Sequence, residues 1–164
     1  MPTLTAHGIT VSPPSGWDGQ IFRHDPETLP GSSSPEARTQ ALTETTPPVA
    51  HVANFALPPE RGDFGGGAVE LMASGAVFVS LLEHPPEEAG TALFAPNQGV
   101  PWPVSADDFS PDTLQRGLAG QSGLQRFFVV DGRPFCLYVV LGSHRLRSVL
   151  VPQVNDVLAS VTFG

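Results

Sequence analysis

Short stretches with alternating apolar and polar residues recur along the chain, each bounded by proline or glycine. Such alternation is typical of half-buried β-strands. It predicts strands at 7–14, 17–24, 49–57, 68–72, 76–84 and 91–95. Pro13 and Pro14 close the first strand, a turn follows at Ser15–Gly16, and the second strand is expected to return from that turn.

The stretch LQRFFVVDGRPFCLYVVLG, residues 124–142, is the clearest hairpin. Asp131–Gly132 suits a type I′ turn, whose two central residues need positive φ. Two-residue closure pairs Val130 with Arg133 and sets Pro134 opposite Val129, where a missing N–H is tolerated. The same register pairs Phe128 with Phe135 and Arg126 with Leu137. Residues 135–141 are apolar on both faces, which predicts a central strand covered on both sides, partly by helices.

Two helices are expected. Apolar residues recur at helical spacing between 146 and 161, which predicts a helix from 148 to 160. Their stripe is Leu146, Val149, Leu150, Val154, Val157, Leu158 and Val161. Pro152 lies off this stripe and either belongs to the first turn or kinks a longer helix. Ser110, as a cap before Pro111, predicts a short helix at 111–118 that ends by Gly120.

The stretch RGDFGGGAVELM, residues 61–72, contains an RGD tripeptide, a DFG and three consecutive glycines. A phosphate-binding loop places its glycines between a strand and a helix, with the helix N-terminus facing the anion. Here the glycines follow a loop and precede a predicted strand. The interpretation favoured over a phosphate site, an adhesion signal or a kinase motif is a turn that opens the strand.

Residues 25–48 contain five prolines and few large apolar residues, which is typical of a loop. The chain of 164 residues is otherwise long enough for one domain with its own core. The patterns together predict a single α+β domain, 1–164, in which helices pack on a twisted antiparallel sheet and the C-terminal helix is central to the core.

Charge and composition exclude several classes of function. All eight basic residues are arginine, as expected for a bacterium with a GC-rich genome, and without lysine a Walker A loop or a Schiff-base mechanism is impossible. Residues 1–115 carry a net charge of −11 and residues 116–164 a net charge of +3. An acidic protein repels the phosphate backbone, so no nucleic-acid partner is expected.

No stretch approaches the roughly 18 apolar residues of a membrane span, and the first residues lack the basic and apolar regions of a secretory signal. No membrane insertion is therefore expected. The single Cys136 cannot form an internal disulfide, which fits the reducing cytoplasm. In the middle of an apolar strand, Cys136 is interpreted as a small buried hydrophobe.

The five histidines show no HxxxH, HExxH or HxH spacing, and no GxSxG motif accompanies them. The sequence therefore predicts no metal, no cofactor and no catalytic residues, and the protein is expected not to be an enzyme. The alternative is a small hydrolase or ligand-binding enzyme. It requires a deep cleft that gathers at least two of His51, His84 and His144 with a carboxylate.

Two tryptophans and four arginines are candidate partner-binding residues. Trp17 follows Ser–Gly, and Trp102 lies between Pro101 and Pro103; each either covers the core or anchors a partner. The arginines belong to the final hairpin and helix, where they either complement the acidic remainder or form a patch for an anionic partner. They are Arg126, Arg133, Arg145 and Arg147. Self-association is also left open.

Both ends of the chain resemble a known pattern. GITVSPPSGW, residues 8–17, resembles the opening strand and P-x-GW turn of the PsbP-like superfamily, which includes the photosystem subunit PsbP and a Ran-binding nuclear import factor. VNDVLASVTF, residues 154–163, is similar to its closing helix; the insertion at 25–48 is a departure. The resemblance implies an α/β/α sandwich without catalytic residues. It also implies an adaptor, an accessory subunit or a chaperone, like the secretion-effector chaperones among its relatives.

Overall fold

The structure, a computed structural model, describes residues 3–24 and 46–164. The loop predicted at 25–48 lies outside the described residues, except for residues 46–48. None of the helices in the described part of the chain has the length and apolar character that a membrane span requires.

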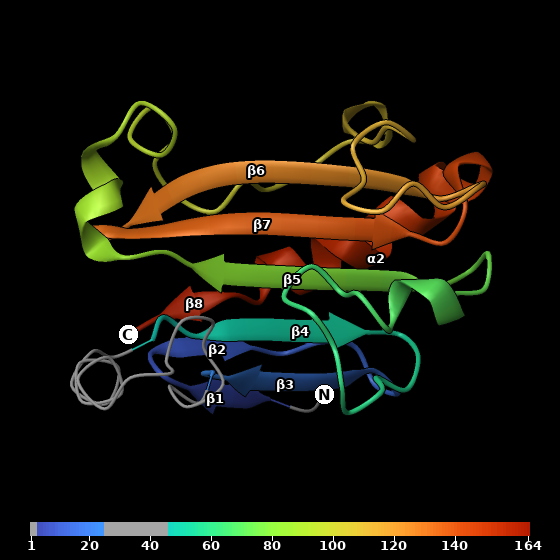
Figure 1. The fold of residues 1–164 in the computed structure, drawn as a ribbon, viewed down its shortest axis with the longest axis horizontal. Coiled ribbons are helices and arrows are strands. Elements are labelled where there is room, and N and C mark those ends of the chain that lie inside the picture. The colour runs from blue at the N-terminus through green and yellow to red at the C-terminus, as the bar shows by residue number, and fades with distance from the viewer. Residues whose placement is uncertain (1–2, 25–45) are drawn as a thin grey trace, which may run out of the picture.

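Two antiparallel sheets and a C-terminal helix form an α+β fold, as predicted (Figure 1). The larger sheet has the order β3-β4-β5-β7-β6, with bounds Asp18–Phe22, Val49–Ala53, Val77–Glu83, Arg133–Leu141 and Ser122–Val130. The smaller sheet has the order β1-β2-β8, with bounds Leu4–Ala6, Ile9–Val11 and Thr162–Phe163. The predicted pairing of the first two strands is wrong, because β2 pairs with β1 and β8 while β3 pairs with β4.

The β6–β7 hairpin has the predicted register. Val130 pairs with Arg133 and Val129 with Pro134. Asp131 and Gly132 have φ values of 50° and 76°, as a type I′ turn requires. The N–H of Val129 points away from Pro134 and donates to the carbonyl of Asn97 at 2.9 Å. The proline therefore removes no ladder hydrogen bond. As its composition indicated, β7 is an interior strand of the sheet, and all its residues except Arg133 are buried.

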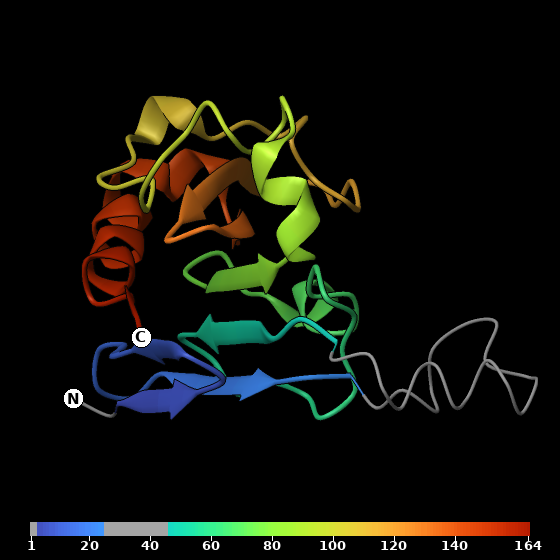
Figure 2. The ribbon, with the colours of Figure 1, turned by 90° about the vertical axis from the view of Figure 1, so that its left-hand side faces the viewer.

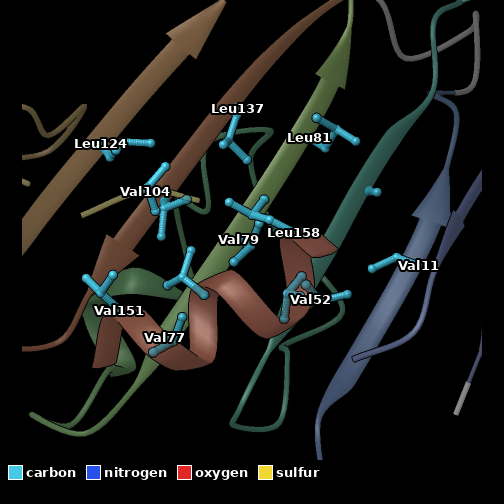
Figure 3. Close-up of a cluster of buried hydrophobic side chains, with 14 of the residues drawn as sticks. Val11, Val52, Val77, Val79, Leu81, Val104, Leu124, Leu137, Val151 and Leu158 are labelled. Carbon is cyan, nitrogen blue, oxygen red and sulfur yellow. The ribbon is translucent and has the colours of Figure 1, made fainter. Parts of the chain in front are cut away.

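The C-terminal helix α2, Arg147–Ala159, covers one face of the larger sheet (Figures 2 and 3). Its buried residues are Leu150, Val151, Val154, Val157 and Leu158. Two members of the predicted stripe, Leu146 and Val149, are instead 38% and 64% exposed. The buried side of the helix instead includes Val151, which belongs to the same core cluster as Val104. Pro152 is the sixth residue of α2, beyond its first turn.

The opposite face of the larger sheet is covered by loop segments, where the PsbP-like sandwich implied a second helical layer. Within the described residues much of this cover comes from partly buried side chains of the segments 55–72 and 114–118. They are Phe55, Leu57, Phe64, Met72, Leu114 and Leu118. Figure 2 shows the segment that follows β4 on the side of the sheet away from α2.

Three predicted elements in these loops are wrong. Residues 68–72 contain a 3-10 turn, η2 (Val69–Leu71), because their amides bond to carbonyls within the same loop. Residues 91–95 form turns that close on the carbonyl of Thr91. The helix at 111–118 does not form, although the hydroxyl of Ser110 accepts from the amide of Asp112. The amide of Gln115, which a helix would direct to residue 111, instead donates to the hydroxyl of Tyr138.

Candidate functional site

A row of polar side chains crosses the face of the larger sheet that lies opposite α2. Gln20 pairs with His51, His51 with Ser80, Ser80 with Tyr138, and Tyr138 with Gln125. Paired residues of antiparallel strands project to the same face, so five strands contribute one side chain each. Sequence reasoning missed this row, because its members are far apart in the sequence and only the strand register aligns them.

His51, the member of this row on β4, is fully buried. Its Nε2 lies 3.0 Å from the carbonyl oxygen of Asp63, and its Nδ1 accepts from Nε of Arg61 at 3.0 Å. Because Nδ1 accepts, the proton is on Nε2, and the imidazole is neutral. Burial lowers the pKa of His51 to about 4, and the nearby charge of Arg61 acts in the same direction. The histidine is therefore a structural hydrogen-bonding group at neutral pH.

The RGD stretch is fixed against this row. Arg61 donates to Gln20 Oε1 at 2.7 Å as well as to His51. The carboxylate of Asp63 lies 2.5 Å from Nε2 of His24, and its carbonyl accepts from the hydroxyl of Ser80 at 2.6 Å. The turn interpretation is confirmed, although the strand expected after it is not formed. Since both charged side chains bond within the protein, the tripeptide is not presented as an adhesion signal.

A groove of about 450 Å³ lies between this loop and the segment 114–116. We call it the Tyr138 groove. Its lining includes Tyr138, Val140 and Gln121 from the sheet side and Phe64 and Leu114 from the loops. Gln121 is only 5% exposed, and its Nε2 donates to the carbonyl of Val69 at 2.8 Å. Its Oε1 is the one buried side-chain nitrogen or oxygen in the described residues that has no hydrogen-bond partner.

The histidines of the enzyme alternative do not meet. His51 is buried in the middle of β4, whereas His84 follows β5 and lies 3.1 Å from the carboxylate of Glu88. His144 follows the opposite end of the hairpin, where its Nδ1 lies 2.8 Å from the hydroxyl of the buried Ser122. Among residues 3–24 and 46–164 the required cleft is not formed, and no group of three or more metal-ligating side chains is found there.

The structure separates the two tryptophans. Trp17 is partly buried and packs against the core between the sheet and α2, so it covers the core. Trp102 is 54% exposed. The segment 99–104, which we call the Trp102 loop, is therefore the element that presents a large aromatic ring to solvent.

The four arginines do not form one patch. Arg126 lies 3.4 Å from Asp108, close to the Trp102 loop along the chain. At one end of the hairpin, Arg133 forms two bonds to Glu83, at 2.7 and 3.0 Å, and donates to two carbonyls of the β1–β2 turn. Arg145 and Arg147 follow the other end of β7, where Arg147 donates to the carbonyl of His144. Arg133 thus connects the two sheets.

No family model, curated protein or solved structure matches this chain. Two features of the described structure are candidate functional sites. One is the Trp102 loop, which exposes an aromatic side chain. The other is the Tyr138 groove, whose lining includes the buried Gln121 with its Oε1 left without a partner among the described residues.

Proposed function

We propose that this chain is a non-catalytic protein-binding domain, an adaptor, chaperone or accessory subunit, that docks a protein partner through the Trp102 loop. One observation carries the proposal: Trp102 is 54% exposed on a loop that is held at both ends. Tryptophan is enriched among the residues that dominate binding energy at protein interfaces.

The loop is held by hydrogen bonds to its backbone at both ends. The amide of Gly99 donates to the carbonyl of Val129 on β6 at 2.8 Å. At the other end, Asn155 of α2 bonds both backbone groups of Val104, with both distances 2.9 Å. Pro101 and Pro103 restrict the backbone between these two points. The ring is therefore held in place before binding, and little conformational entropy is lost when a partner docks.

Charge indicates the chemistry of the partner. The protein carries a net charge of −8, and Asp107 and Asp108 follow the loop in the 3-10 turn η4, Ala106–Asp108. Arg126, the arginine closest to these acids, lies within ion-pair distance of Asp108. The complementary surface is an apolar pocket for Trp102 with a basic rim, which would also accelerate association with an acidic domain.

The relationship to the PsbP-like superfamily stays a prediction. The antiparallel sheet and the hairpin that leads into a C-terminal helix agree with it. Its members generally bind proteins, which supports the same function. We also propose a cytoplasmic location, because the lone thiol of Cys136 is buried and suits a reducing compartment.

The test is to isolate the partner with immobilised wild-type protein, purify it, and measure its affinity for single-site variants. We expect Trp102→Ala to weaken binding about 30-fold, the effect of losing a residue worth 2 kcal/mol at an interface. Leu93→Ala is the matched control, because Leu93 is also 54% exposed but lies outside the loop. Equal affinity of Trp102→Ala and wild type would contradict the proposal. Binding of a second copy of this chain would identify the interaction as self-association.

A further inference from the structure

We propose that the Tyr138 groove binds a small, uncharged aromatic molecule that carries a carboxamide. This site is separate from the Trp102 loop and does not depend on the proposed function. Its volume of about 450 Å³ lies within the roughly 300–1,000 Å³ typical of small-molecule sites.

The wall of the groove suits an aromatic ring. Phe64 and Tyr138 meet edge to face with ring centroids 5.3 Å apart, and Val69, Leu114 and Val140 complete an apolar lining. Aromatic rings favour such edge-to-face and offset arrangements over face-to-face stacking. The groove is also formed in advance, because the loop that carries Phe64 is fixed through the carbonyl of the preceding Asp63 to His51 and Ser80.

Gln121 requires a hydrogen-bond donor from the ligand. Its side-chain nitrogen is used by the carbonyl of Val69, which assigns the other atom as the acceptor, Oε1. A buried acceptor without a partner is destabilising, and a donor that reaches it recovers the cost. An amide N–H supplies such a donor without a charge.

The hydroxyl of Tyr138 favours a hydrogen-bond acceptor on the ligand. Its hydroxyl oxygen accepts from the amide of Gln115 at 2.8 Å, while the hydroxyl hydrogen has no acceptor in the part of the chain that the structure describes. Burial raises the pKa of Tyr138, so the phenol keeps this hydrogen at neutral pH. A carbonyl oxygen on the ligand is the complementary group, and a carboxamide provides both the carbonyl and the N–H.

The charges in the lining favour an uncharged ligand. The carboxylate of Asp63 is bonded to His24, and the guanidinium of Arg116 lies 3.1 Å from the carboxylate of Glu70. Both charges already have a partner of opposite charge or a hydrogen-bond partner within the protein. A carboxylate in place of the carboxamide would moreover bring a negative charge to the acceptor oxygen of Gln121.

The experiment compares three probes of similar size, benzamide, acetophenone and benzoate, by ¹H–¹⁵N NMR titration of the full chain. Acetophenone keeps the ring and carbonyl of benzamide but lacks its N–H. We expect benzamide to saturate with a Kd on the order of 10 mM, which about 0.3 kcal/mol for each of its heavy atoms gives. The shifted amides should lie in 62–69 and 114–121. We expect at least tenfold weaker binding of acetophenone and benzoate.

Two variants assign the polar contacts. Gln121→Leu should remove the preference for benzamide over acetophenone, and Tyr138→Phe should weaken both probes. Gln98→Leu, at an exposed glutamine outside the groove, should change neither. Absence of saturable shifts around the groove with benzamide, or equal binding of acetophenone to the wild-type protein, would overturn the proposal. This comparison of probes needs no variant, so it holds even where a substitution prevents folding.

Discussion

At the scale of single residues, His51 joins the glycine-rich loop to the sheet. It is buried and neutral, receives a hydrogen bond from Arg61 and lies within hydrogen-bonding distance of the backbone of Asp63. Protonation would place a charge in a site that burial disfavours and would remove the acceptor that Arg61 uses. The loop, and with it one wall of the Tyr138 groove, therefore depends on His51 remaining neutral.

The lowered pKa of His51 predicts a pH-dependent stability. Its pKa is about 4 in the folded protein and 6.5 when unperturbed, so the unfolded chain binds more protons between these values. The stabilising contribution is complete above pH 6.5 and is lost as the pH falls toward 4. We expect the free energy of unfolding to decrease by about 2 kcal/mol from this group between pH 7 and 4.5, as the linkage relation gives.

Urea unfolding at the two pH values measures this loss. His51→Gln should show a smaller decrease than wild type, whereas His7→Asn, in the β1–β2 turn, should retain it. Equal decreases in wild type and His51→Gln would show that other groups are responsible.

At the scale of elements, the conformation of the glycine-rich loop depends more on Gly65 than on Gly66. Gly65 has a φ of +87°, and a Cβ added to it would lie 2.7 Å from the ring of Phe78. Gly66 has no such restriction, because a Cβ there would have no neighbour within 4 Å. Adjacent glycines in one loop therefore have different reasons for their presence.

We expect Gly65→Ala to lower the free energy of unfolding by about 2 kcal/mol or more, because the left-handed conformation alone costs 1–2 kcal/mol and the contact with Phe78 adds to it. Gly66→Ala, the matched control, should be within about 0.5 kcal/mol of wild type. Denaturant unfolding of the two variants checks this difference. Similar stabilities would show that the loop relaxes around the new methyl group.

At the scale of the whole molecule, the two ends of the chain close the fold together. β8 pairs with β2, and Phe163 packs on Phe135 with ring centroids 4.6 Å apart. Arg133 lies over both rings and bonds to Glu83 and to the β1–β2 turn. The C-terminal strand and Arg133 thus both attach the smaller sheet to the larger one, and Ile9 and Val11 of β2 are buried in the same core.

This arrangement predicts that Phe163→Ala destabilises the protein by about 2 kcal/mol, somewhat less than full burial would give for a phenylalanine. Hydrogen exchange should accelerate most in β2, the strand that pairs with β8. Thr162→Ala, at the exposed neighbour in the same strand, is the control. Uniform acceleration over both sheets would indicate that the smaller sheet does not unfold separately.

The sequence by itself determined the elements whose signals are local. Asp131–Gly132 selects the type of turn. Pro134 has no N–H and is therefore tolerated only at a non-hydrogen-bonded pair. The β6–β7 register thus followed from residues adjacent in the sequence. The helix predicted at 148–160 agrees with α2 within one residue at each end, because its apolar spacing extends over four turns. The turn at 61–67 followed from its glycines.

Only the tertiary structure decided the rest. Residues 68–72 alternate like a strand, yet they form a turn because carbonyls of their own loop accept from their amides. The cap at Ser110 starts a turn, but the hydroxyl of Tyr138 binds the amide that would continue the helix. The polar row and the Tyr138 groove depend on the register between strands that are far apart in the sequence. Trp17 and Trp102 differ because Trp17 packs against the core whereas Trp102 is exposed. Local patterns contain no information on such long-range pairing, because a side chain's partners are set by the packing of the whole chain.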